Sequence, residues 1–468
     1  MGKEVKSVAV KDRINKYDQQ MKRKLVELGQ SNKEYRHILQ YLEGEIKQST
    51  TMCTFDYSLM CFKNDGVYQL NKAIEEIYGV SQSKSESTPS GDDAKIQTVD
   101  IQLADGTRLK VPYGKIDLPE AGKGANININ YSNSNNTLII QGCCEYRFSS
   151  MIDDIVERTQ ILLNSNSIYK NQAIELSDNC VPKIMDLSDI DKEFMVLSSR
   201  TEYDLQPLNS RLLHPDRCIE KGISLKYGCL MEGPYGTGKT LLAFKLAKNA
   251  IDNGWVFMYL KSPELLAQTL RLAKTLDKNG HGVVIFVEDI DQVTRGNRDT
   301  AMQDILNTLD GGDTKQMNVI SLFTTNHIEL IEPTFLRGKR IGSIISLGFL
   351  DAVTAEKFVN ETFSKDGYVV DKEGIDEVYK LIEKSDIAPA FMAEITESVK
   401  SHMILTDENI VKAEYLRNSV KSYLHQVALS RKKDMSETDE SKLAASMRSI
   451  ITSELKPIME RVDQYFQD

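Results

Sequence analysis

The chain is poor in cysteine and histidine, and neither residue type is grouped. Seven cysteines occur among 468 residues, an odd number, and no two of them have the C-x-x-C spacing. This usage argues against a disulfide framework or a zinc site and is typical of reduced thiols in a cytosolic compartment. The six histidines stand singly along the chain. We therefore expect a cytoplasmic protein whose fold depends on neither disulfides nor zinc.

Long apolar runs and an excess of positive charge are also missing. No run approaches the length of a membrane span, and the first residues lack the apolar stretch of a signal peptide. The formal net charge is −10, and no basic stretch studded with aromatic residues offsets it. Nucleic-acid binding needs such a basic footprint. We expect no membrane segment and no nucleic-acid partner.

The chain does contain a glycine-rich loop with the pattern G-x-x-x-x-G-K-[ST]. It consists of Gly233, Pro234, Tyr235, Gly236, Thr237, Gly238, Lys239 and Thr240. Residues 227–231 before it have the pattern of a strand, and residues 241–247 after it have that of a helix. Glycines let backbone N–H groups turn toward phosphates, and the helix N-terminus adds partial positive charge. We expect this loop and Leu241 to bind ATP, with Lys239 at the β- and γ-phosphates and Thr240 on Mg²⁺.

Polar residues follow two further predicted strands. The apolar run 283–287 ends in Glu288 and Asp289, and the run 319–323 leads to Asn326. Acidic residues at the end of such a strand face the phosphate loop, where they can hold Mg²⁺ and orient a water. The sequence therefore predicts that these side chains meet the loop at one edge of a sheet.

Together with a Leu-Asp-Gly turn at 309–311 and arginines at 337 and 340, these motifs resemble those of the AAA+ ATPases. The resemblance covers about residues 205–400 and points to the branch of AAA proteases, proteasomal ATPases and severing enzymes. It implies a P-loop NTPase α/β fold with a parallel sheet and a C-terminal helical lid. It assigns Asn326 to the attacking water, and Arg337 and Arg340 to the ATP of a neighbouring subunit. A homo-oligomer follows, in this family usually a hexameric ring.

The chain departs from the family at the acidic strand end, where the family has Asp-Glu and this chain has Glu288-Asp289. Aligning residues 290–291 with the family assigns Glu288 to Mg²⁺, through water, and Asp289 to the attacking water. Carboxylate chemistry survives this exchange, but water positioning is sensitive to shifts of about 1 Å. The pattern favours a working but slower ATPase over an inactive one.

Two further departures concern the ring. Where the family has an aromatic–apolar–glycine pore loop, residues 265–272 continue as a predicted helix, so threading of a polypeptide by that loop is in doubt. The segment from Arg337 to Arg340 lacks the usual proline, which leaves its rigidity in doubt. We expect partner engagement outside the pore, on the N-terminal region up to about residue 195.

The composition along the chain suggests five parts. Residues 1–50 carry an amphipathic, coiled-coil-like helix, and 51–195 an α+β accessory domain with hairpins near 99–111 and 127–140 and a helix at 151–163. Residues 196–350 form the large ATPase domain, 351–430 the helical lid and 431–468 a helical tail. The stripe of the first helix consists of Ile14, Met21, Leu28, Tyr35 and Leu42. This stripe fits a coiled coil with a partner or another subunit as well as a helix packed on its own domain.

Two functions stay open from the sequence. The first is an oligomeric AAA+ ATPase that remodels or regulates an unidentified protein partner. The second is a nucleotide-gated scaffold that binds ATP and hydrolyses little or none. The acidic balance argues against a nucleic-acid-directed member, and Asn326 with the two arginines argues against a small-molecule kinase.

Overall fold

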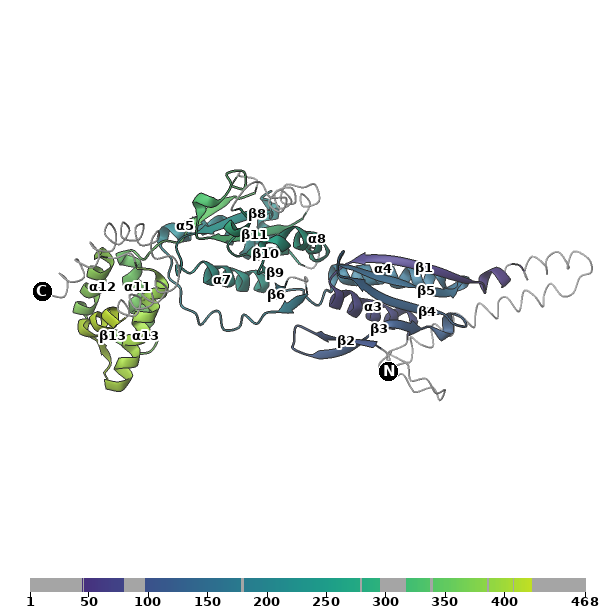
Figure 1. Ribbon diagram of the computed structural model, residues 1–468, viewed down its shortest axis with the longest axis horizontal. Coiled ribbons are helices and arrows are strands. Elements are labelled where there is room, and N and C mark those ends of the chain that lie inside the picture. The colour runs from purple at the N-terminus through teal and green to yellow at the C-terminus, as the bar shows by residue number, and fades with distance from the viewer. Residues whose placement is uncertain are drawn as a thin grey trace, which may run out of the picture.

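A computed structural model describes most of the chain between residues 44 and 422. The described residues are 44, 46–79, 97–177, 181–277, 280–294, 317–336, 340–384, 387–406 and 408–422. Several predictions lie outside them: the apolar stripe of the first helix, the Leu-Asp-Gly turn, Arg337 and the helical tail. Within the described residues, the chain forms three parts in a row along its longest axis (Figure 1).

The first part is an antiparallel sheet with two helices. Its strand order is β1-β5-β4-β3-β2, and both predicted hairpins, β2–β3 and β4–β5, are confirmed. At the first hairpin Gly106 takes a φ of 81°, the left-handed turn conformation that glycine allows. The elements are β1 (Met52–Met60), α3 (Lys63–Tyr78), β2 (Gln97–Gln102), β3 (Arg108–Asp117), η1 (Pro119–Ala121), β4 (Asn126–Ser132), β5 (Thr137–Glu145), η2 (Tyr146–Phe148) and α4 (Ser149–Ser165).

A buried carboxyl ties α3 to the segment that leaves this domain. The Asp65 side chain accepts hydrogen bonds from the Ser167 hydroxyl at 2.6 Å and the Ile168 amide at 3.1 Å. Burial raises the pKa of Asp65 to about 6, although these hydrogen bonds oppose the shift. The contact stabilises the junction between the accessory domain and the next sheet.

The second part is a seven-stranded sheet of order β12-β8-β11-β10-β9-β6-β7. All neighbouring strands pair in parallel except β7, which is antiparallel at the edge, so the sheet is mixed rather than purely parallel. Its elements are β6 (Ala173–Leu176), β7 (Pro182–Ile184), α5 (Ser199–Leu213), α6 (Pro215–Glu220), β8 (Tyr227–Glu232), α7 (Lys239–Asp252), β9 (Trp255–Leu260), η3 (Pro263–Leu265), α8 (Leu266–Leu276), β10 (Gly282–Val287), α9 (Asp291–Thr294), β11 (Val319–Thr325), η5 (Ile328–Leu330) and β12 (Ser343–Ser346).

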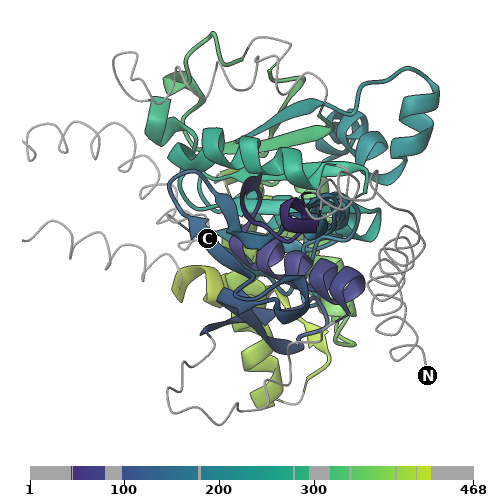
Figure 2. The same cartoon turned by 90° about the vertical axis from the view of Figure 1, so that its right-hand side faces the viewer.

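Helices cover both faces of this sheet, because successive side chains of a strand point to opposite sides. On one face α5 and α7 pack on Phe257 and Phe286. On the other face α8 packs on Met258 and Ile285, in one continuous core with the accessory domain. Helix α8 adjoins α4 of that domain (Figure 1). Figure 2, turned by 90°, looks along the row from the accessory side.

The structure places the end of the accessory domain earlier than the predicted boundary at residue 195. Strand β6 pairs in parallel with β9, with Ile174 opposite Met258, and β7 pairs with β6, so both strands belong to the ATPase sheet. Short strands so far from their partner in sequence carry no local signal of where they pair. The following segment then reaches the third part, where Phe194 meets Phe358 with ring centroids 5.1 Å apart.

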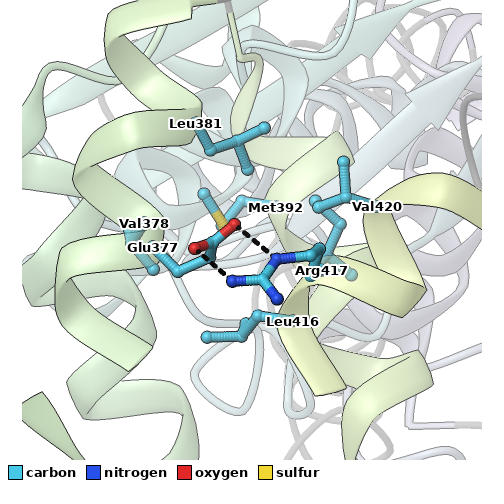
Figure 3. A pocket seen from close by; sticks show the side chains of 8 residues that line it. Glu377, Val378, Leu381, Met392, Leu416, Arg417 and Val420 are labelled. Carbon is cyan, nitrogen blue, oxygen red and sulfur yellow. Dashed lines mark hydrogen bonds and ion pairs between the residues drawn. The ribbon is translucent and has the colours of Figure 1, made fainter. Parts of the chain in front are cut away.

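The third part is helical, as predicted, but also contains a two-stranded parallel sheet that the sequence analysis did not expect. Its elements are α11 (Ala352–Ser364), β13 (Val369–Val370), α12 (Lys372–Lys384), α13 (Pro389–Thr406), β14 (Ile410–Val411) and a helix at 413–422. Figure 3 shows Arg417, from the helix at 413–422, beside Glu377 of α12 at a small apolar pocket. Two nitrogens of the Arg417 guanidinium donate to the two carboxylate oxygens of Glu377, at 3.1 and 3.3 Å. In the described part of the chain, no helix has the length and apolarity needed to cross a bilayer.

Candidate functional site

The glycine-rich loop links the end of β8 to the start of α7, as its flanking patterns predict. Its three glycines all have positive φ: 149° at Gly233, 78° at Gly236 and 90° at Gly238. L-residues with a side chain rarely adopt such angles, so the loop depends on glycine. A Cβ at Gly233 would lie 2.0 Å from the Leu347 carbonyl oxygen, which makes this position intolerant of any side chain.

Lys239 is the first residue of α7 and points back over the loop. It is only 7% exposed, and its Nζ donates to the carbonyl of Gly233 at 2.8 Å, that of Pro234 at 2.9 Å and Oδ1 of Asn326 at 2.7 Å. Burial lowers the pKa of Lys239, while nearby carboxylates, Asp289 first, oppose that shift. An ammonium held by neutral oxygens inside a glycine loop is suited to accept a phosphate as its counter-charge.

Asn326 joins this lysine to the acidic strand end. Its Nδ2 donates to Oδ1 of Asp289 at 3.0 Å, so one amide connects Lys239 and Asp289. Asp289 has a left-handed φ of 46°, and its amide donates to the Thr324 hydroxyl at 3.0 Å. Left-handed backbone at a non-glycine residue is strained and concentrates at functional sites. The predicted meeting of Asn326, Asp289 and the loop is present.

Glu288 lies on the other side of the loop, against Thr240. The Thr240 hydroxyl donates to Oε1 of Glu288 at 2.5 Å, and the Tyr259 hydroxyl donates to Oε2 at 2.7 Å. Burial, followed by the hydrogen bond to Glu288, raises the pKa of Tyr259 well above its usual range. A hydroxyl and a carboxylate side by side are the hard oxygen donors that Mg²⁺ prefers, so this pair fits the expected metal.

Of the two predicted arginines, the structure describes Arg340, whereas Arg337 lies outside the described residues. Arg340 is half-buried, and its Nη1 donates to the Thr334 carbonyl of its own chain. Its backbone carbonyl passes so close to Gly228 that a Cβ there would lie 1.7 Å from it. A role of either arginine at a neighbouring subunit stays a prediction.

Two features of the site escaped the sequence analysis. Tyr259 was assigned no role, although it carries a hydroxyl near the end of β9, the strand beside the one that leads to the two acids. The second feature is α13, whose Ala390 amide donates to the Gly236 carbonyl at 3.1 Å. The third part of the chain therefore touches the phosphate loop directly, which no local pattern could indicate.

Comparison with known proteins finds a family match over the region that holds the site. Residues 229–349 match the family described as "ATPase family associated with various cellular activities (AAA)". The chain is 30% identical over 201 residues to the peroxisomal ATPase PEX6 of Saccharomyces cerevisiae, and 32% identical over 180 residues to that of Candida glabrata. It is 27% identical over 193 residues to the 26S protease regulatory subunit 6A of Caenorhabditis elegans.

These three matches each cover only part of the chain. They cover 40%, 35% and 38% of this chain, and 18%, 17% and 42% of the three relatives. The chain thus spans less than half the length of each of these relatives. The family match at residues 229–349 includes the phosphate loop and leaves out the accessory domain.

Proposed function

We propose that this chain, whose central region matches the AAA ATPase family, works as an oligomeric ATPase that remodels or regulates a protein partner. The observation that carries this proposal is the hydrogen-bonded constellation around the phosphate loop. Lys239, Asn326 and Asp289 form one chain of contacts, and Thr240 and Glu288 form another. Phosphate-binding, water-orienting and metal-binding groups thus converge on one loop.

Each group has a role that follows from its position. Lys239 would move its ammonium from the loop carbonyls onto the β- and γ-phosphates of ATP. Asp289 would accept the proton of the attacking water, while Asn326 holds that carboxylate in place. Thr240 and Glu288 would hold Mg²⁺, which supplies charge neutralisation at the phosphates. The exchanged order of the two acids leaves both roles filled.

We further propose that the active unit is a ring, in keeping with family membership, with arginines acting across subunit interfaces. Subunits with Lys239→Ala, mixed with subunits carrying Arg337→Ala or Arg340→Ala, should regain activity at mixed interfaces only. Full-rate hydrolysis by isolated monomers would contradict the ring.

The burial of helix α8 argues for partner engagement outside the pore. Helix α8, which stands where the family has its pore loop, buries Leu266 and Leu270 in the core shared with that domain. Side chains buried in this way are not free to grip an extended polypeptide. We therefore propose that the partner binds the N-terminal region up to about residue 195.

Steady-state hydrolysis separates the ATPase from the alternative, a nucleotide-gated scaffold. The wild-type chain should hydrolyse ATP, and Lys239→Ala should abolish both turnover and tight ATP binding. The matched control is Lys248→Ala on the same helix, which removes only a surface ion pair with Asp252 at 2.6 Å. If the wild-type chain binds ATP tightly but hydrolyses it no faster than Lys239→Ala does, the result would favour the scaffold.

A further inference from the structure

Tyr259 is placed to control the carboxylate of Glu288. Its hydroxyl lies 2.7 Å from Oε2 of Glu288, while the Thr240 hydroxyl lies 2.5 Å from Oε1. The two oxygens of one carboxylate are therefore held by two different elements, β9 and α7. We infer that Tyr259 is a positioning residue that holds Glu288 for metal binding, an inference that rests on the proposed ATPase function.

The ring of Tyr259 is fixed by its neighbours. In the parallel pairing of β9 with β10, Tyr259 stands opposite Phe286. Phe286 precedes Glu288 by two residues, so the side chains of Tyr259, Phe286 and Glu288 share one face of the sheet. The Tyr259 ring stacks on Phe286, with centroids 5.4 Å apart, and meets Phe244 of α7 edge-on at 5.5 Å. A ring packed in this way aims its hydroxyl in one direction.

The length of the Glu288 side chain explains why a second hydrogen bond to its carboxylate is useful. This side chain is one methylene longer than the aspartate that the family has at this position, and each added torsion offers more staggered rotamers. Thr240 alone contacts one oxygen, which leaves the carboxylate free to rotate about that contact. The hydrogen bond from Tyr259 to the second oxygen removes this freedom.

The test measures metal binding rather than hydrolysis alone. Mn²⁺ is added to the full chain saturated with ADP, and its binding is followed by electron paramagnetic resonance. Tyr259→Phe keeps the ring and removes only the hydroxyl, so Mn²⁺ affinity should fall about 10- to 100-fold, the usual effect of losing a hydrogen bond that orients a metal ligand. ADP affinity without metal should stay unchanged, and in hydrolysis the Mg²⁺ requirement should rise.

Two further variants make the result specific. Tyr227→Phe alters a tyrosine of the same sheet whose ring lies under Arg211, 4.1 Å from its guanidinium carbon, and should leave Mn²⁺ affinity unchanged. In a Glu288→Asp background the carboxylate is withdrawn from Tyr259, so adding Tyr259→Phe should cost much less than tenfold. An equal loss in both backgrounds would mean that the hydroxyl acts elsewhere and would overturn the inference.

The inference and the proposed function fail in different ways. If Tyr259→Phe binds Mn²⁺ as tightly as the wild type does, and the wild type hydrolyses ATP, only the positioning role is overturned. A wild-type chain that binds ADP but shows no Mn²⁺ binding at all would overturn the metal-assisted ATPase, and the positioning role with it.

Discussion

Replacing Asn326 by alanine tests the link between the phosphate loop and the acidic strand end. The substitution removes two hydrogen bonds, one from Lys239 at 2.7 Å and one to Asp289 at 3.0 Å. Both partners carry charge, so each contact belongs to the stronger class of hydrogen bond. The question is which loss governs turnover.

The loss at Asp289 should dominate. Lys239 keeps its two carbonyl partners at 2.8 and 2.9 Å, and it gives up Asn326 anyway when it moves onto phosphate. Asp289 instead loses the side-chain donor that aims its carboxylate. A hydrogen bond to a charged group contributes about 1.5–3 kcal/mol, which corresponds to a decrease in kcat of about 10- to 150-fold. The KM for ATP should change little, because the phosphate contacts remain.

Steady-state ATP hydrolysis, with kcat and KM determined separately, is the assay. Asn253→Ala is the matched control: it removes an asparagine at the far end of α7 whose side chain donates only to the Asn249 carbonyl at 2.8 Å. Thermal unfolding of both variants should resemble that of the wild type. A kcat within twofold of wild type for Asn326→Ala would refute the role of Asn326 in holding Asp289. A large rise in KM at constant kcat would move that role to nucleotide binding.

Three other perturbations test the surrounding structure. Gly233→Ala places a Cβ 2.0 Å from the Leu347 carbonyl oxygen and should abolish tight ATP binding in calorimetry, whereas unchanged affinity would mean that the loop adapts. Leu270→Ala leaves a cavity in the core that α8 shares with the accessory domain and should destabilise the chain by about 2–5 kcal/mol in urea unfolding, with a loss below 1 kcal/mol counting against this burial. Burial raises the pKa of Asp65 in the folded chain to about 6, above the ordinary 3.8. Its contribution to the free energy of unfolding is therefore full below pH 4 and declines by about 3 kcal/mol as the pH rises through 6. Asp65→Asn should lack this decline when α3 is followed by hydrogen exchange, and an unchanged pH slope would assign it to another group.

Much of the nucleotide site could be predicted because its information is local. The loop from Gly233 to Thr240 is one continuous segment whose glycines dictate the backbone, and the structure confirms their positive φ angles. Glu288 directly follows one apolar run and Asn326 stands three residues after another, and parallel strands bring their carboxyl ends to one edge of a sheet. The sequence therefore predicted that these residues meet, as well as the strands and helices that carry them.

Other features depend on contacts between distant segments, about which a local pattern says nothing. The short segment that forms β6 carries no signal that it pairs with β9 about 80 residues later, so the domain boundary was placed too late. Apolar spacing predicts that α8 buries one side, but only packing shows that the accessory domain shares that core.

The same division holds within the site. The sequence by itself determined which chemical groups are present and in what order, because a phosphate loop and the ends of strands are encoded by consecutive residues. Only the tertiary structure decided which neighbours orient them: Tyr259 onto Glu288 across two strands, and Ala390 onto Gly236 from the third part of the chain. Orientation comes from side-chain packing between elements, and packing partners are chosen by the whole fold rather than by the sequence around either residue.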